Sequence, residues 1–296
     1  MTMHLISAKI TCPVCGELAE WFFTKNGYDI YRCRCCLHMF VFPLSNVSFE
    51  IYDQGYFFGE GDFGYGDYDG DKDVLSCNFN KYLKKINQFV KLRGKLFDVG
   101  AATGIFIELA NSQGWCASGI ELSADASLAG KKRGLGIIKG NFESLDIEMT
   151  DFTVVTFWDV LEHFINPEIA IINAGNMLKV GGLLAINTPN VGSVVARILG
   201  RKWHLIGPPE HLHYFSLNSL KLLLERNNFE LLYTGYIGKR FSLRYVFKTL
   251  AHWQKCFVWN SIYSYLKNNQ IGKLNFPIDT FDNMFIVARK VCKPKE

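Results

Sequence analysis

One stretch in the first half of the chain constrains the fold more than any other: residues 95–106 read KLFDVGAATGIF. An apolar run that carries one carboxylate, Asp98, breaks into a turn from Gly100 to Gly104, and apolar residues at helical spacing follow. Strand, glycine turn and helix in this order present a nucleotide-sized ligand at the carboxyl ends of an α/β sheet. The spacing D-x-G-x-x-x-G differs from the G-x-G-x-x-G of dinucleotide sites, and an acid just before the turn favours a cationic ligand.

Further apolar runs follow at the distances that such a sheet requires. The second run ends at Glu121, about 20 residues beyond the glycines, where an acid can accept both ribose hydroxyls of an adenosine. The third ends at Asn141 and Phe142, an amide and a ring suited to an adenine. The fourth, 151–158, runs into the segment DVLEH, and a helix over 167–178 and a fifth strand over 180–190 come next.

Six motifs therefore stand in order: DVGAATG, GIE, GNF, DVLEH, LKVGGLLAINTPN and PEHLHYFS. Over about residues 80–290 they resemble the class I S-adenosylmethionine-dependent methyltransferases, in particular the methyltransferase type 11/12/23 group. The resemblance implies an α/β fold with a Rossmann-like seven-stranded sheet, a sixth strand over 229–235 and an antiparallel last strand over 284–289. It also implies that S-adenosyl-L-methionine is the cofactor and that its contacts are Asp98, Gly100, Ala101, Thr103, Gly104, Glu121, Leu122, Asn141, Phe142, Trp158 and Asp159.

Four of the nine cysteines form two knuckles near the N-terminus, Cys12-x-x-Cys15 and Cys33-x-x-Cys36, separated by 17 residues. Four thiolates on two tight turns can close a tetrahedral site, so residues 1–45 are expected to form a zinc ribbon with structural Zn²⁺. Redox chemistry is the alternative. In so small a module the metal would supply the free energy of folding, and a thiolate site beside free thiols indicates a reducing cytoplasm.

Residues 46–78 are rich in glycine, aspartate and aromatic side chains and show no clear periodicity. We interpret this segment as a lid over cofactor and acceptor, because a plain linker rarely carries so many aromatics; a surface linker is the alternative. The lid candidates are Tyr52, Tyr56, Phe57, Tyr65 and Tyr68. A helix over 74–92 is expected to lead into the methyltransferase domain, 79–296.

The segment GPPEHLHYFS, 207–216, offers a Glu-His pair after the fifth strand. Together with the ribbon it is similar to zinc-containing sugar C-methyltransferases, whose matching segment reads Tyr-His-Glu-His. The resemblance implies that His211, assisted by Glu210, is the general base, although Pro208 and Pro209 replace the family's Tyr and His. A structural hydrogen-bonding role for His211 is the alternative, and a structural role is the preferred interpretation of His163.

The insertion before the last strand, 239–275, has helical spacing. Over 239–273 it contains basic and aromatic residues but no Asp or Glu. A helical cap on the core is the expected structure. The alternatives are peripheral contact with an anionic membrane, which would suit a lipid-linked saccharide substrate, and binding of a phosphate-bearing or nucleic-acid acceptor.

These observations predict a cytoplasmic enzyme that transfers a methyl group in line to a small-molecule or saccharide-type acceptor. Two other functions stay open: an rRNA base methyltransferase whose ribbon binds RNA, and a non-catalytic scaffold. The net charge of only +4 and a ribbon without a basic stripe argue against nucleic acid. A hydrophobic content of 49% indicates a globular core, and no apolar run reaches the ~18 residues that span a bilayer.

Overall fold

The computed structural model describes residues 9–44, 56–57, 67–254 and 256–292. Its centre is a seven-stranded sheet of order β10-β13-β8-β7-β4-β5-β6. β13 is antiparallel to both of its neighbours and the other pairs are parallel, so the Rossmann-like α/β fold is confirmed. The strands are β4 (Lys95–Val99), β5 (Cys116–Glu121), β6 (Ile137–Lys139), β7 (Phe152–Trp158), β8 (Leu178–Pro189), β10 (Phe229–Gly235) and β13 (Asn283–Lys290).

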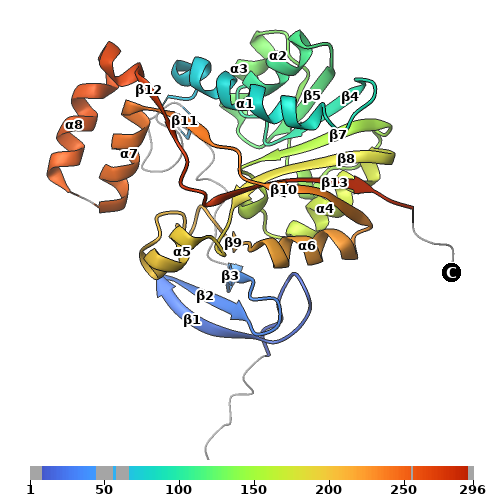
Figure 1. Cartoon of the computed structure of the whole chain (residues 1–296), viewed down its shortest axis with the longest axis horizontal. Coiled ribbons are helices and arrows are strands. Elements are labelled where there is room, and N and C mark those ends of the chain that lie inside the picture. Colours follow the sequence, from blue (N-terminus) through green and yellow to red (C-terminus); the bar gives the residue numbers. More distant parts are fainter. Residues whose placement is uncertain (1–8, 45–55, 58–66, 255, 293–296) are drawn as a thin grey trace, which may run out of the picture.

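Helices cover both faces of the sheet (Figure 1). On one face lie α1 (Lys72–Ile86), α2 (Ile105–Ser112) and α3 (Ala124–Lys132); on the other lie α4 (Pro167–Met177) and α6 (Leu217–Arg226). The buried strand residues divide accordingly into two apolar clusters, one packed against α1 and α2 and one against α4 and α6. The expected helix over 74–92 is shorter than its apolar spacing suggested. α1 ends at Ile86, and Phe89 and Val90 reach the same cluster from a turn.

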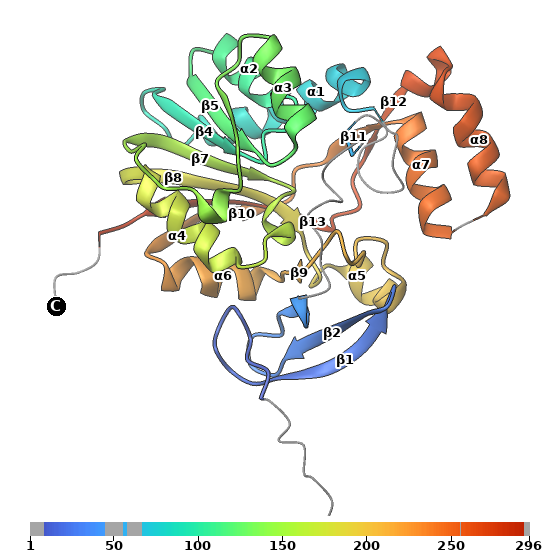
Figure 2. The same ribbon diagram turned by 180° about the vertical axis from the view of Figure 1, so that it is seen from behind.

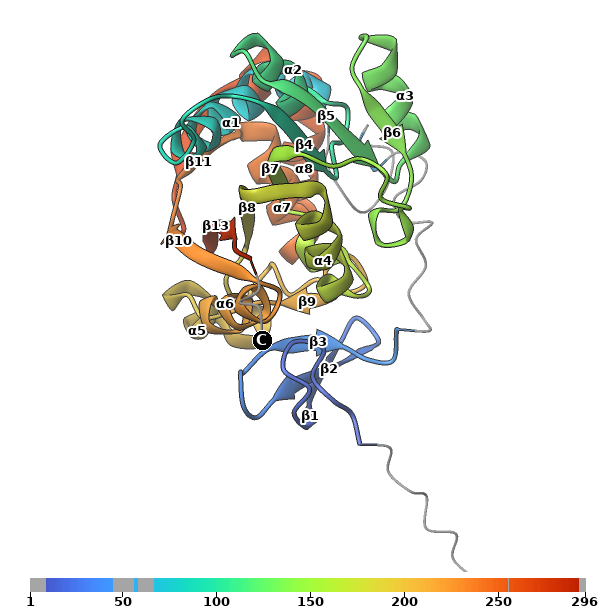
Figure 3. The same ribbon diagram turned by 90° about the vertical axis from the view of Figure 1, so that its right-hand side faces the viewer.

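The N-terminal residues form a second, four-stranded sheet, seen below the main domain in Figure 3. Its order is β1 (Ala19–Lys25), β2 (Tyr28–Cys33), β3 (Met39–Val41) and β9 (His213–Tyr214). β9 belongs to the segment between β8 and α6, so the main domain contributes the last strand of the ribbon's sheet. The two parts share a core around the fully buried Trp203.

The insertion is not helical throughout. Its ends pair as the antiparallel strands β11 (Lys239–Ser242) and β12 (Asn275–Ile278), which bring Phe241 opposite Phe276. Between them α7 (Leu243–Gln254) and α8 (Phe257–Lys267) form a helical hairpin beside the main domain, followed by the short 3-10 helix η7 (Gln270–Lys273) (Figure 2). Within the described part of the chain, no helix is both long and apolar enough to cross a membrane. The remaining helical elements are α5 (Val194–Leu199), η3 (Asp69–Asp71), η4 (Phe142–Ser144), η5 (Leu161–His163) and η6 (Gly200–Lys202).

Candidate active site

The glycine turn and Glu121 form one hydrogen-bonded unit at the carboxyl edge of the sheet. Gly100 and Gly104 have positive φ angles of 74° and 87°, and a Cβ on Gly100 would lie 2.7 Å from Cγ2 of Val160, so only glycine fits there. Glu121 Oε2 accepts a hydrogen bond from the backbone N–H of Ala102 at 2.8 Å. Its Oε1 accepts one from Ser123 N–H at 2.8 Å. These two hydrogen bonds hold the Glu121 carboxylate against the glycine turn.

Asp98 lies buried beside this unit. Its Oδ1 accepts a hydrogen bond from Thr156 Oγ1 at 2.6 Å. Burial raises the pKa of Asp98 to about 8 despite that hydrogen bond, and the neighbouring Glu121 charge adds to the shift. Burial likewise raises the pKa of Glu121. Two desolvated acids side by side are costly when ionised unless a cation joins them, so this edge suits a positively charged ligand.

Aromatic residues from the expected lid lie near the buried acids and near the Glu210–His211 pair. The pKa of Tyr68 is raised well above its usual value, first by burial and then by the charges of Asp98, Glu121 and Asp159, which places its phenol among these acids. The ring of Phe57 contacts Tyr68 edge to face at 5.6 Å between centroids. Tyr56 donates a hydrogen bond to Glu210 Oε1 at 2.5 Å. The lid candidates Tyr52 and Tyr65 lie outside the described residues.

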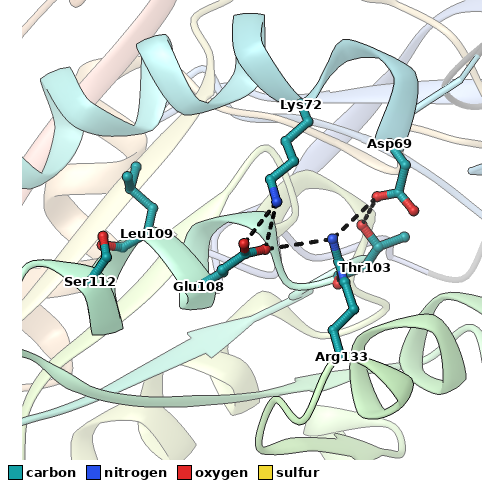
Figure 4. A network of polar contacts seen from close by, with 7 residues as sticks. All are labelled: Asp69, Lys72, Thr103, Glu108, Leu109, Ser112 and Arg133. Atoms are coloured by element: carbon teal, nitrogen blue, oxygen red, sulfur yellow. Dashed lines mark hydrogen bonds and ion pairs between the residues drawn. The ribbon is translucent and has the colours of Figure 1, made fainter.

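A polar network fixes the segment that leads from Tyr68 into α1 (Figure 4). Thr103 of the glycine turn donates from Oγ1 to Asp69 Oδ1 at 2.6 Å. Lys72 forms an ion pair with Glu108 of α2 at 2.7 Å, and Arg133 lies within 3.6 Å of Glu108 and 3.8 Å of Asp69. Exposed pairs of this kind contribute little stability, about 0–1 kcal/mol each. They do bind the start of α1 directly to the turn.

The other residues expected at the cofactor are placed as follows. The side chain of Asn141 accepts a hydrogen bond from Glu143 N–H at 2.9 Å and caps η4. Phe142 is buried among other phenylalanine rings, and Trp158 stacks on Phe285 in the opposite apolar cluster. Ala101, in the glycine turn, is buried, and Leu122, which directly follows Glu121, is half-buried. Contacts of these residues with a cofactor stay predictions.

Asp159 is joined to the insertion by a contact that sequence reasoning missed. It has a positive φ of 53°, its Oδ1 accepts a hydrogen bond from Asn187 Nδ2 at 2.6 Å, and its Oδ2 contacts Lys239 Nζ at 2.7 Å. Although burial lowers the pKa of Lys239, the Asp159 charge outweighs it and raises that pKa. Lys239 is one of the several basic residues of the insertion, and no sequence signal distinguishes it from the others.

Two histidines and a glutamate meet where β7 and the 207–216 segment come together. One ligand atom each of Glu162, His163 and His211 lies within 4.8 Å of the other two. The imidazole rings of His163 and His211 contact edge to face at 4.9 Å between centroids. Burial raises the pKa of Glu162 to about 7 and, together with His211, lowers that of His163 to about 4. Glu162 was not among the expected site residues, although its adjacency to His163 after the fourth strand was a usable signal.

Of the expected pair, His211 belongs to this cluster and Glu210 lies beside it. His211 Nδ1 is 2.6 Å from the carbonyl of Leu205, and His163 Nδ1 is 2.7 Å from the carbonyl of Glu210. Burial raises the pKa of the Glu210 carboxyl, but His211, His163 and the Tyr56 hydrogen bond outweigh it and lower that pKa. Glu210 is therefore an anion beside the two imidazoles.

The four knuckle cysteines converge in the ribbon. Sγ of Cys12 lies 3.6 Å from that of Cys36, Sγ of Cys15 lies 3.4 Å from that of Cys33, and all four lie within 4.8 Å of one another. Metal–sulfur bonds of about 2.3 Å in a tetrahedron put sulfurs about 3.8 Å apart, so the donor set fits a Zn²⁺ ion. The fifth thiol, Cys35, is exposed.

The ribbon is attached to the candidate active-site segment itself. Val41 N–H donates to the Leu212 carbonyl at 2.9 Å, next to His211. His38 Nε2 lies 3.1 Å from His213 Nδ1, and both rings are buried. Lys25 and Asn26 contact backbone carbonyls of Trp203 and Pro208. The ribbon therefore supports the 203–214 backbone from the side opposite the sheet.

Comparisons with known proteins agree with this architecture. A family model described as a methyltransferase domain matches residues 75–234, more than half of the chain. A ubiquinone biosynthesis O-methyltransferase from Glaesserella parasuis is 31% identical over 137 residues, which are 41% of this chain and 57% of the relative. One from Coxiella burnetii is 30% identical over 118 residues, 36% of this chain and 49% of the relative. The chain thus spans about half the length of these curated relatives.

Solved structures share the fold. A putative methyltransferase from Bacillus halodurans superposes with a TM-score of 0.54 at 17% identity, covering 72% of this chain and 100% of that one. A SAM-dependent methyltransferase from Archaeoglobus fulgidus gives a TM-score of 0.51 at 18% identity, covering 74% and 94%.

Proposed function

The chain belongs to the methyltransferase domain family, and from that premise we propose that it transfers the methyl group of S-adenosyl-L-methionine to a hydroxyl oxygen of a small-molecule acceptor, a phenol or a saccharide. The observation that carries the proposal is the pair of buried acids, Asp98 and Glu121, against the glycine turn. The names of the two curated relatives, both O-methyltransferases, support oxygen as the accepting atom.

The chain's own residues would hold the cofactor in a defined order. Gly100 to Gly104 would contact the methionine part through their backbone, and Asp98 would face its positive charge. Glu121 would accept the ribose hydroxyls, exchanging its bonds to backbone N–H groups for bonds to the ligand. Asn141 would mark the adenine end. Tyr68, which already lies among the acids, would close over the site.

The cofactor supplies an electrophilic methyl group, and the protein supplies alignment and proton removal. His211 is the proposed proton acceptor, since its Nδ1 is bound to the Leu205 carbonyl and its ring is thereby fixed. The adjacent Glu210 anion would stabilise the imidazolium that forms. In this step the acceptor oxygen gains the methyl group and its proton passes to the imidazole.

We propose that the four-cysteine cluster holds a structural Zn²⁺ ion whose role is indirect. The four cysteines form a cluster separate from that of Glu162, His163 and His211, and the ribbon contacts the 203–214 backbone. The metal would stabilise the ribbon, and the ribbon would hold His211 in place.

The wild-type protein and one variant test the assignment. Cofactor titration by calorimetry, followed by methyl transfer to a panel of phenols, sugar nucleotides and lipid-linked saccharides, establishes the wild-type activity. His211→Gln keeps a side-chain amide that can donate to the Leu205 carbonyl but cannot accept the proton. Turnover should fall about 10²–10⁴-fold while cofactor affinity stays within twofold. Unchanged turnover in this variant would refute the role of His211, and failure of the wild-type protein to bind the cofactor would refute the function.

Exposed apolar side chains on the helical hairpin support a second proposal, peripheral contact with an anionic membrane. Phe257 is 82% exposed, and Trp253, Val258 and Tyr265 are exposed near it in the sequence. Arg244 is buried in ion pairs with Asp67 and Asp71 and does not contribute to a basic surface. Pelleting with anionic vesicles should decrease in Phe257→Ser and not in the control Val180→Ser, an exposed valine on β8. Equal pelleting of both would contradict this contact.

A further inference from the structure

The cluster of Glu162, His163 and His211 contains a buried carboxylate oxygen whose hydrogen-bonding capacity is not satisfied. Glu162 is 1% exposed. Its Oε2 accepts a hydrogen bond from Thr188 Oγ1 at 2.8 Å. Its Oε1 is buried and has no hydrogen-bond partner among the described residues. An unpaired buried carboxylate oxygen costs about 1–3 kcal/mol or more, so a ligand is expected to satisfy it.

The hydrogen bonds of Nδ1 in the two imidazoles determine which ring nitrogen carries the lone pair. Nδ1 of His163 bonds the Glu210 carbonyl and Nδ1 of His211 bonds the Leu205 carbonyl. A carbonyl only accepts, so each Nδ1 carries the proton and each Nε2 carries the lone pair of the neutral ring. A backbone carbonyl on the far nitrogen is the arrangement that orients metal-bound histidines.

We propose that Glu162, His163 and His211 bind one divalent transition-metal ion, and that this ion holds the acceptor's oxygen for methyl transfer. One nitrogen of each imidazole and one carboxylate oxygen of Glu162 lie within 4.8 Å of one another. Bonds of about 2.1 Å put neighbouring ligands about 3 Å and opposite ligands about 4.2 Å apart, so a small side-chain adjustment closes the site.

The donor set also selects the metal. Two imidazoles and one carboxylate suit Zn²⁺, Mn²⁺ or Fe²⁺, whereas Mg²⁺ and Ca²⁺ prefer sites made of oxygen alone. Three protein ligands leave positions for the acceptor and for water. Glu210 adds a negative charge beside the cation.

This inference rests on the proposed function, because the acceptor hydroxyl would be the exchangeable ligand. A bound cation lowers the pKa of a coordinated hydroxyl, so the acceptor would lose its proton to water on binding and be methylated as the anion. When the ion is bound, His211 is a metal ligand, and loss of the acceptor's proton to water replaces the proton transfer to His211 described under the proposed function.

Manganese provides a probe that separates this site from the ribbon. Mn²⁺ favours oxygen and nitrogen ligands and does not compete for a thiolate site that holds Zn²⁺. The protein is loaded with a single equivalent of Zn²⁺, which the four thiolates take first, so that the Glu162–His163–His211 site is left without Zn²⁺. It is then titrated with Mn²⁺ in the absence of acceptor, and free Mn²⁺ is measured by electron paramagnetic resonance. We expect one Mn²⁺ per chain, and a loss of affinity of about 100-fold or more in Glu162→Gln and in His211→Gln, since even outer-shell changes cost 10–100-fold.

The control is Glu225→Gln, which removes an exposed carboxylate on α6 that forms a surface ion pair with Lys221, and it should bind Mn²⁺ as the wild type does. Melting temperatures identify variants that fail to fold. If Glu162→Gln fails to fold, His211→Gln carries the test. Absence of Mn²⁺ binding, or equal binding in all variants, would overturn the metal site. Cofactor binding and chelator-resistant methyl transfer would then leave the proposed function intact with His211 as base.

Discussion

The raised pKa of Asp98 predicts that cofactor binding depends on pH. Below a pKa of about 8 the buried carboxyl is mostly protonated, whereas a cationic ligand favours the carboxylate. Binding should therefore release a proton, and affinity should rise as the pH rises towards 8. The folded-state pKa also exceeds the unfolded value, so without ligand the free energy of unfolding decreases as the pH rises between about 4 and 8.

The expected change of cofactor affinity with pH follows from the linkage between proton release and binding. Well below the pKa, affinity changes about tenfold per pH unit, equivalent to about 1.4 kcal/mol, and the slope flattens near the pKa, so affinity should increase about 25-fold between pH 6 and pH 7.5. Higher pH is avoided because the ligand's own α-amino group loses its proton near 8. Asp98→Asn is a matched control, since an amide oxygen can still accept the hydrogen bond from Thr156.

Calorimetry in two buffers of different ionisation heat measures both the cofactor affinity and the number of protons released on binding. The wild type should release close to one proton per S-adenosylmethionine at pH 6.5, and Asp98→Asn should bind more weakly with little pH dependence. The same slope and the same proton release in both proteins would show that Asp98 does not face the cation.

Three further predictions concern the cofactor, the ribbon and the insertion. Glu121→Gln should weaken cofactor binding about 10–100-fold by calorimetry, since hydrogen bonds to a charged group are worth about 1.5–3 kcal/mol each; unchanged affinity would contradict a ribose contact. Cys36→Ser, or zinc removal by a chelator, should expose the ribbon to proteolysis and lower turnover more than cofactor affinity; intact protease resistance would argue against a metal-dependent ribbon. Arg244→Met should lower stability in urea by about 3–5 kcal/mol because Asp71 keeps a buried charge, and adding Asp71→Leu should restore most of it; no recovery would show that the ion pair is not the cause.

The main domain could be predicted from sequence because its signals are local. The apolar run that ends at Glu121 and the strand expected over 229–235 each depend on neighbouring residues, and they correspond to β5 and β10. The glycine turn and Glu121 follow from the same local logic. Four-cysteine spacing similarly indicated which sulfurs converge.

What could not be predicted depends on partners far apart in the chain. β9 has only two residues and forms by pairing with β3, so no periodicity marks it. Lys239 and Arg244 look like surface cations until Asp159 and Asp71 are brought against them. His163 was interpreted alone, and its meeting with His211 requires the tertiary fold.

The strand contributed by His213–Tyr214 also bears on the order in which the chain matures. Phe40 pairs with His213, so the small sheet lacks its outer edge until the ribosome has made nearly three quarters of the polypeptide. An edge that waits so long for its partner is open to pairing with other nascent chains. Expressing the first 45 residues alone would leave β3 without β9, and removing them would leave β9 without β3. The ribbon and the main domain are therefore best regarded as a single folding unit.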